Sequence, residues 1–200
     1  MSLGERRGAL LVPMSAAKSM LREQLRRDRE LSFMPDSWLH IVQAREIQSA
    51  NVVASYHSYG FEPQTQDING ALLRAGKILL LPRTLKNRDI EWVAWDGSEK
   101  SLKKSGKVYE PVGEAFTDLS AIDVVIVPAL HIDREGNRLG QGGGSYDRAL
   151  SRMAGWKIGI VGAAELGGVR LPIESHDQKV DAAATPTLLL RFTLNGAGHP

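Results

Sequence analysis

Apolar runs rich in β-branched residues recur along the chain, and between them apolar residues return every three or four positions. Continuous apolar runs are typical of buried strands, whereas the longer period is typical of amphipathic helices. Strands are predicted at 51–56, 77–81, 90–95, 122–127, 156–163 and 187–192. The run at 90–95 alternates apolar and polar residues, which predicts an edge or half-exposed strand. Strands that alternate with helices predict a mostly parallel sheet covered on both faces.

The predicted helices have recognisable start and stop signals. They lie at 15–30, after Asp36, at 66–75 and at 146–153. Ser15, Asp36 and Thr65 are suitable N-caps because a short polar side chain can accept from a free helix N–H. Gly76 is suited to follow the third helix, and Pro82 is predicted to end the strand that comes next.

The first predicted helix has an apolar face and a basic face. Leu21 and Leu25 are spaced to face a core. The basic face consists of Lys18, Arg22, Arg26 and Arg29. A charged stripe is most often solvated, so the pattern alone assigns these four cations to the surface.

Length and composition narrow the class of protein. The 200 residues suit one domain, which we place at 15–194, with 1–14 as a mobile leader and 195–200 as a tail. A net charge of +2 indicates neither a nucleic-acid nor a membrane partner. Five histidines without any cysteine argue against a zinc site or a disulfide scaffold. No apolar run is long enough to span a bilayer, and we expect a cytoplasmic monomer.

The densest group of glycines lies between the strand at 122–127 and the helix at 146–153. These glycines are Gly136, Gly140, Gly142, Gly143 and Gly144. Glycine adopts backbone angles closed to other residues, so successive N–H groups can converge on an anion beside a helix N-terminus. Arg138 and Arg148 suit phosphate oxygens, and Asp147 offers an oxygen ligand for Mg²⁺. The segment is therefore predicted to bind a phosphate.

This segment matches neither of the common nucleotide motifs. The Walker pattern is absent, and the G-x-G-x-x-G that begins at Gly140 has Ser145 in place of its third glycine. A flexible surface loop is the alternative that composition leaves open. Two arginines, a tyrosine and an aspartate at the junction of a strand and a helix favour a binding site.

The stretch from Val127 to Arg148 resembles the signature of the 5-formyltetrahydrofolate cyclo-ligase family, V-P-x-x-x-x-D-x-x-G-x-R-L-G-x-G-G-G-Y-Y-D-R. The matching residues are Val127, Pro128, Asp133, Gly136, Arg138, Leu139, Gly140, Gly142, Gly143, Gly144, Tyr146, Asp147 and Arg148. Ser145 departs from the pattern, because the family usually has tyrosine there. Shorter similarities at 18–22, 56–65, 106–111 and 171–181 extend the resemblance over most of the chain.

The resemblance implies a fold and a reaction. The fold is a three-layer α/β/α sandwich with a Rossmann-like sheet. The reaction is the cyclisation of 5-formyltetrahydrofolate to 5,10-methenyltetrahydrofolate, in which ATP phosphorylates the formyl oxygen and ADP and phosphate are released. ATP is the co-substrate and Mg²⁺ the cofactor.

The resemblance also implies the residues of the site. ATP would be bound by Lys18, Arg22, Arg138, Leu139, Gly140, Gln141, Gly142, Gly143, Gly144, Ser145 and Tyr146. The folate would be bound by Glu62, Gln141, Gly142, Gly143, Gly144 and Ser145. Asp147 and Asp177 would hold Mg²⁺, and the catalytic residues would be Tyr146 and Arg148. The segment Tyr109, Glu110 and Pro111 is expected to line the site.

Three other functions remain open at this point. A catalytically altered paralogue would bind nucleotide and folate without turnover, and Ser145 is the direct support for it. A serine hydrolase would pair Ser145 with His131 or His176, although the surrounding residues do not form G-x-S-x-G. A sugar-phosphate or acyl-CoA binding protein of related fold would use the glycines for a different phosphate.

Overall fold

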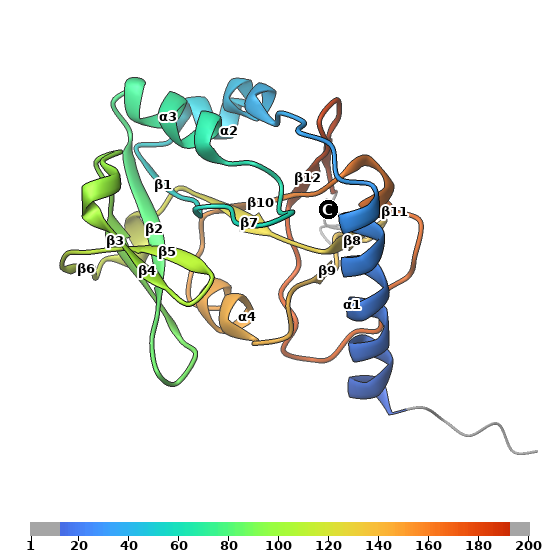
Figure 1. Ribbon diagram of the computed structural model, residues 1–200. Coiled ribbons are helices and arrows are strands. Elements are labelled where there is room, and N and C mark those ends of the chain that lie inside the picture. The colour runs from blue at the N-terminus through green and yellow to red at the C-terminus, as the bar shows by residue number, and fades with distance from the viewer. Residues whose placement is uncertain (1–12, 193–200) are drawn as a thin grey trace, which may run out of the picture.

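An eight-stranded sheet forms the centre of the computed structural model, which describes residues 13–192 (Figure 1). Across the sheet the strands lie in the order β13-β12-β10-β7-β1-β2-β3-β6. Their bounds are β1 Val52–Ala54, β2 Ile78–Thr84, β3 Ile90–Ala94, β6 Ala115–Phe116, β7 Val124–Pro128, β10 Trp156–Ile160, β12 Ala182–Ala184 and β13 Leu189–Arg191. The leader and tail predictions at 1–12 and 195–200 lie outside the described residues.

The five inner strands are parallel, and the antiparallel strands lie at the two edges. β7 pairs in parallel with both β1 and β10, and β1 and β10 continue in parallel to β2 and β12. β3, β6 and β13 pair antiparallel. The mostly parallel sheet is thereby confirmed. The predicted edge strand at 90–95 is β3, which β6 separates from the edge and which is largely buried.

Helices cover both faces of the sheet, which confirms the three layers. α2 (Arg45–Ser49), α3 (Gln66–Arg74) and the 3₁₀ helix η1 (Leu39–Gln43) cover one face, and α4 (Ser145–Leu150) covers the other (Figure 1). Ile41, Ile47 and Ile68 are buried in the core of the first face. Leu150 and Trp92 are buried in the core of the second.

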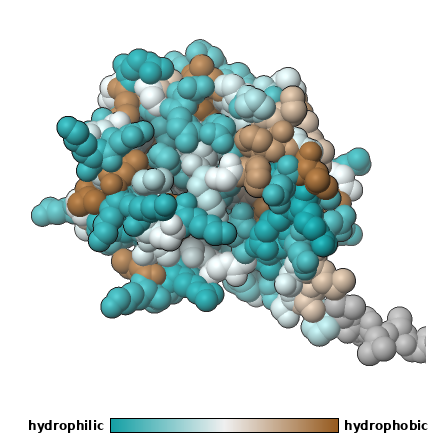
Figure 2. All heavy atoms as spheres, in the orientation of Figure 1, coloured by the Kyte–Doolittle hydropathy of each residue, from teal (hydrophilic) through white to brown (hydrophobic). Residues whose placement is uncertain are grey.

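The long helix α1 (Met14–Leu31) packs beside the segment that follows β7. Its Leu25 contacts Leu130, Leu139 and Leu171, with Leu21 against the same cluster, so the predicted apolar face is confirmed. Hydrophilic side chains gather over α1 on the visible face of the molecule (Figure 2).

Smaller elements complete the fold around the sheet. They are β4 (Leu102–Ser105) with β5 (Val108–Pro111), the three-stranded group β8 (His131–Asp133), β9 (Arg138–Leu139) and β11 (Leu166–Gly167), and the 3₁₀ turns η2 (Glu99–Ser101), η3 (Leu119–Ala121) and η4 (Ala163–Glu165). Among the described residues, no helix combines the length and the apolar character needed to cross a membrane.

Two predicted helix starts are wrong. α1 begins at Met14, inside the predicted leader, and neither Ser15 nor any other side chain caps it. Asp36 does not begin a helix. Residues 39–49 form η1 and then α2, because Ala44 between them is extended (φ −61°, ψ 135°) and interrupts the helical hydrogen bonds.

The signals around α3 are confirmed at its C-terminus and only partly at its N-terminus. Thr65 occupies the N-cap position, but its hydroxyl donates to the Tyr56 carbonyl instead of capping the helix. Gly76 has φ +74°, and the N–H groups of Gly76 and Lys77 donate to Leu73 and Leu72, which is the Schellman arrangement.

Pro82 does not end its strand, because β2 continues to Thr84. The pairing of β1 with β2 stops at Leu80, while β3 pairs with β2 from Leu80 to Thr84. Beyond Leu80 one side of β2 is therefore free, and a proline is tolerated on a strand edge.

Candidate functional site

A cavity of about 420 Å³ lies at the carboxyl ends of β1, β2 and β7. Open parallel sheets place ligands at this end of their strands. The walls of the cavity are α1, the loop after β1, β5, the segment 138–147 and the turn 174–177. In Figure 1, α1 and β5 stand on opposite sides, and the chain leading into α4 passes between them. Every residue predicted for the site except Arg148 and Pro111 lines this cavity.

The glycine segment Gly140–Gly144 forms the base of the cavity. Gly142 and Gly144 have φ of +101° and +67°, a region that side chains other than glycine rarely adopt. A Cβ on Gly140 would lie 2.7 Å from Nη1 of Arg138. Within residues 13–192, the N–H groups of residues 141–144 donate no hydrogen bond. The segment thus has free donors where an anion can enter.

Lys18 and Arg22 project from α1 into the cavity. Lys18 is 4% exposed, and its Nζ lies 2.7 Å from Glu174 and 2.5 Å from Asp177. Burial alone would lower the pKa of Lys18, but the hydrogen bonds to Asp177 and Glu174 raise it above its ordinary value. Nε of Arg22 donates to the Gly140 carbonyl at 3.0 Å. Both cations are therefore charged and adjacent to the glycine segment.

Arg138 and Asp147 form a partly buried ion pair behind the glycines. Nη2 of Arg138 donates to Oδ1 of Asp147 at 2.7 Å, and Nε of Arg138 is buried without a partner in the described part of the chain. The N–H of Gln178 also donates to Oδ1 of Asp147. Oδ2 of Asp147 accepts no hydrogen bond from residues 13–192, which leaves it available to a ligand.

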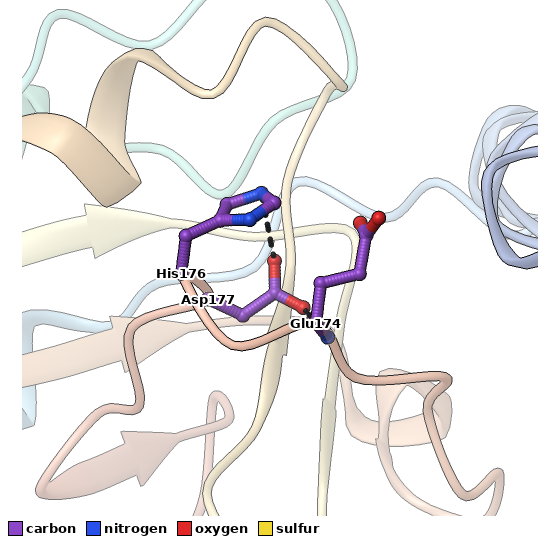
Figure 3. A group of neighbouring side chains, drawn as sticks. All are labelled: Glu174, His176 and Asp177. Atoms are coloured by element: carbon purple, nitrogen blue, oxygen red, sulfur yellow. Dashed lines mark hydrogen bonds and ion pairs between the residues drawn. The ribbon is translucent and has the colours of Figure 1, made fainter.

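A second group of oxygen and nitrogen donors lies in the turn after β11. One ligand atom each of Glu174, His176 and Asp177 lie within 4.8 Å of one another (Figure 3). Oδ2 of Asp177 accepts from Lys18 and from the Glu174 N–H. Burial alone would raise the pKa of Asp177, but these hydrogen bonds lower it, so the group is a carboxylate. Sequence reasoning missed Glu174, because a glutamate in a polar turn resembles any solvated residue.

The two predicted metal ligands fit a hard cation by the chemistry of their oxygens. Within the described part of the chain, Oδ2 of Asp147 accepts no hydrogen bond, and the one polar partner of Oδ1 of Asp177 is Nε2 of His176, at 4.0 Å. Carboxylate oxygens with unused lone pairs are the donors that Mg²⁺ prefers. Both side chains line the same cavity as the glycine segment.

Glu62 is a buried acid on the opposite wall of the cavity. It is 8% exposed, and Oε2 accepts from the Tyr59 N–H at 3.3 Å. Burial raises the pKa of Glu62 to about 7, against a smaller lowering effect of that hydrogen bond and of Arg29. A carboxyl with unused acceptor capacity in an apolar wall is suited to a ligand that offers N–H donors.

Aromatic rings stand near Glu62. The His57 ring lies 5.7 Å from the Tyr109 ring and 6.3 Å from the Trp95 ring. Trp95 packs against the core of one face of the sheet, and the fully buried Trp92 belongs to the core of the other. Tyr109 and Glu110 line the cavity, whereas Pro111 is buried in β5 and does not. This wall suits a flat ligand.

The two predicted catalytic residues differ in position. Tyr146 lines the cavity, with the Arg138 guanidinium 5.9 Å from its ring centre, and burial raises the pKa of its phenol far above the ordinary range, so it stays neutral. Arg148 is exposed and does not line the cavity. Its guanidinium donates to the carbonyls of Gly143 and Arg88.

The prediction that Arg29 lies on the surface is wrong. Arg29 is 8% exposed, forms a bidentate ion pair with Glu165 at 2.6 and 2.7 Å, and donates to the Ala129 carbonyl. Arg26 is exposed as predicted, but it donates to the side chain and the carbonyl of Gln141.

The hydrolase hypothesis finds no support in the geometry. Ser145 opens α4 beside the glycines. In the part of the chain that the structure describes, neither His131 nor His176 hydrogen-bonds to it. Both ring nitrogens of His131 are buried without a partner, and burial lowers the pKa of this histidine.

The comparisons with known proteins agree on one family. The model of the 5-formyltetrahydrofolate cyclo-ligase family matches residues 14–186. The 5-formyltetrahydrofolate cyclo-ligase of Escherichia coli K12 is 32% identical over 144 residues, which cover 69% of this chain and 79% of the relative. That of Mycolicibacterium smegmatis is 31% identical over 153 residues, covering 69% and 75%. The NMR structure of Aquifex aeolicus 5,10-methenyltetrahydrofolate synthetase superposes with a TM-score of 0.77 at 28% identity, over 92% of this chain and 96% of that one.

Proposed function

The chain belongs to the 5-formyltetrahydrofolate cyclo-ligase family, and we propose that it cyclises 5-formyltetrahydrofolate to 5,10-methenyltetrahydrofolate at the expense of ATP. The observation that carries the ATP requirement is the glycine segment, whose unpaired N–H groups share one cavity with Lys18, Arg22 and Arg138. Free amides and guanidinium groups are the donors that bind phosphate oxygens.

The reaction needs the formyl oxygen to become a leaving group. Transfer of the γ-phosphoryl group to that oxygen releases ADP and makes an O-phosphorylated iminium at the 5-nitrogen. The 10-nitrogen of the folate then attacks the formyl carbon and loses its proton. The carbon–oxygen bond breaks, and phosphate departs as the new carbon–nitrogen bond closes the ring. No covalent intermediate with the protein is required, so its task is positioning and charge neutralisation.

The cations of the cavity bind the triphosphate in this proposal. Lys18 gives two of its three N–H groups to Glu174 and Asp177, which leaves the third for a phosphate oxygen. Nε of Arg22 donates to the Gly140 carbonyl, and its two Nη groups, which bond to no described residue, can meet the phosphates. Arg138 is fixed by Asp147, so its charge is held at one position. Fixed donors in a partly buried site stabilise the charge that develops during phosphoryl transfer without reorganisation.

Asp147 and Asp177 would hold Mg²⁺, which supplies charge neutralisation on the phosphates when it is bound. Each has a carboxylate oxygen free of hydrogen bonds from the described residues. Asp177 stays ionised because Lys18 and the Glu174 N–H stabilise its charge, which lowers its pKa. The chain thus presents two side-chain carboxyl groups in the same cavity as the phosphate-binding segment.

Glu62 binds the folate in this proposal. Its carboxylate accepts from the amino and ring N–H groups of the pterin, a paired contact that fixes the orientation of the ring. His57 and Tyr109 offer aromatic surface beside it. Tyr146 remains neutral at the base of the cavity, so its hydroxyl can donate a hydrogen bond at the reacting centre throughout the cycle.

The test is the formation of the methenyl product, followed by its absorbance. We expect product from 5-formyltetrahydrofolate only when ATP and Mg²⁺ are both present, with one ADP per product. Binding of both substrates without product would instead identify the catalytically altered paralogue that Ser145 suggests. Binding of neither would refute the proposed function.

A further inference from the structure

Three arginines donate hydrogen bonds to carbonyl groups of the glycine segment. Arg22 donates through Nε to the Gly140 carbonyl at 3.0 Å. Arg26 donates through Nη2 to the Gln141 carbonyl and through Nε to Oε1 of the Gln141 side chain, both at 2.9 Å. Arg148 donates to the Gly143 carbonyl at 3.5 Å. Three of the four carbonyls from 140 to 143 are therefore fixed by guanidinium groups.

Fixing a carbonyl also fixes the amide that follows it. The peptide unit is planar and trans, so its C=O and N–H point in opposite directions. A carbonyl of Gly140, Gln141 or Gly143 that points to its arginine turns the N–H of the next residue away from that arginine. Those are amides of residues 141, 142 and 144, which line the cavity and donate no hydrogen bond within the described residues.

Without such contacts the segment would have considerable conformational freedom. Gly142 and Gly144 have positive φ, and glycine populates both signs of φ almost equally. A peptide unit that precedes a glycine, such as Gln141–Gly142, can flip, which would replace an N–H with a carbonyl oxygen at the anion site. A carbonyl oxygen repels phosphate, so the orientation of each peptide unit decides whether the segment attracts or rejects it.

We propose that Arg26 is a positioning residue for nucleotide binding, which acts by holding Gln141 so that the following amides stay turned to the phosphates. Arg148 has the same role at Gly143, where it also joins the segment to the β2–β3 turn through the Arg88 carbonyl. Neither residue lines the cavity, so neither contacts the triphosphate. The inference rests on the proposed ATP-dependent function.

The design of the test relies on a neighbour of Arg26. Arg27 lies on the same helix and has the same charge, but its side chain is 67% exposed and, among residues 13–192, forms an ion pair only with Glu23, at 3.5 Å. Arg27→Ala is therefore the matched control for Arg26→Ala. Arg26→Lys keeps the charge but cannot make the two-pronged contact, because an ammonium lacks the planar fork of a guanidinium.

The measurements are the KM for ATP, kcat and the unfolding temperature of each variant. We expect Arg26→Ala to raise the KM for ATP about tenfold, as the loss of hydrogen bonds to a charged group implies. Arg26→Lys should not restore the wild-type KM for ATP. Arg27→Ala should have the same KM for ATP and the same kcat as wild type. All variants should unfold within a few degrees of wild type, because Arg26 is exposed.

A double-mutant cycle separates positioning from direct phosphate binding. If Arg26 acts through Gln141, the change in KM of Arg26→Ala combined with Gln141→Ala will be smaller than the product of the single changes. Additive effects, or full rescue by Arg26→Lys, would overturn the inference in favour of a simple charge effect. The inference would also be overturned if Arg26→Ala and Arg27→Ala both had the wild-type KM for ATP. A wild-type protein that makes no methenyl product with ATP would refute the proposed function instead.

Discussion

Replacement of Glu62 by glutamine should increase stability at alkaline pH and weaken folate binding. Burial raises the pKa of the Glu62 carboxyl from 4.5 to about 7. Below pH 4.5 the group is protonated in both the folded and the unfolded chain. Between pH 4.5 and 7 the unfolded chain releases this proton and the folded chain keeps it, so the free energy of unfolding falls as the pH rises.

The magnitude follows from the size of the shift. At about 1.4 kcal/mol for each pKa unit, a shift from 4.5 to about 7 amounts to about 3 kcal/mol of stability lost by pH 8. Glutamine has nearly the same shape and no charge, and its side-chain oxygen can still accept from the Tyr59 N–H. Glu62→Gln should therefore gain up to about 3 kcal/mol over wild type between pH 5 and pH 8.

Urea unfolding at a series of pH values from 4.5 to 9 measures this difference. Glu30→Gln, at an exposed position near the end of α1, is the control and should show no pH-dependent gain. A constant difference between Glu62→Gln and wild type at every pH would refute the reasoning, because it would mean that the folded protein ionises Glu62 as easily as the unfolded chain does.

The same variant tests the role proposed for Glu62 in binding. An amide offers one acceptor oxygen where a carboxylate offers two, and its NH₂ group faces the donors of the pterin. We expect the KM for 5-formyltetrahydrofolate to rise on the order of 10- to 100-fold, while the KM for ATP stays near the wild-type value. Equal changes in both constants would indicate a general distortion of the cavity rather than a lost contact.

Three further substitutions have definite expected outcomes. Asp147→Asn should remove most Mg²⁺-dependent turnover in the methenyl assay, and unchanged turnover at saturating Mg²⁺ would remove Asp147 from the metal site. Because the substitution leaves the buried charge of Arg138 without its carboxylate, it should also lower the free energy of unfolding in urea by about 3 kcal/mol. Arg29→Ala should cost about 3–5 kcal/mol in the same unfolding measurement, since it breaks a buried ion pair with Glu165, and a cost under 1 kcal/mol would show that the pair is solvated. Ser145→Tyr should lower the KM for 5-formyltetrahydrofolate about fivefold if the added ring stacks on the ligand, worth about 1 kcal/mol, and identical KM and kcat would contradict that.

Six of the eight strands of the sheet could be predicted from the sequence, the inner ones because they are buried on both faces, whereas the short strands β6 (Ala115–Phe116) and β12 (Ala182–Ala184) were not predicted. Val124 to Val127 and Ile158 to Ile160 are apolar throughout, since no position of a covered strand meets water. The pairs β4–β5 and β8–β9 were not predicted, because they are short and many of their residues are polar. The predicted strand end at Pro82 was wrong because a proline is tolerated in β2 only where β1 no longer pairs with it. The local sequence around Pro82 does not contain the position at which β1 stops.

The glycine segment was predictable because the backbone itself forms the site, so the required residues are consecutive. The partners of α1 were not predictable for the opposite reason. Arg29 pairs with Glu165, which is 136 residues away, and Lys18 pairs with Glu174, which is 156 residues away. Before the fold is known, a buried arginine on such a helix has the same spacing as a solvated one, and only its distant partner distinguishes them.

Ion pairs and hydrogen bonds of charged side chains attach α1 to the domain more than apolar contacts do. It contributes the large apolar side chains of Leu21 and Leu25 to the cluster with Leu130. Four of its cations, Lys18, Arg22, Arg26 and Arg29, tie it to the rest of the domain. Two of those cations, Lys18 and Arg22, are the ones proposed to meet the phosphates. If phosphates bind to these two cations as proposed, undocking of α1 is thermodynamically linked to occupancy of the cavity. A protease or a rise in ionic strength would then distinguish loaded from empty molecules at α1 before any change reached the sheet.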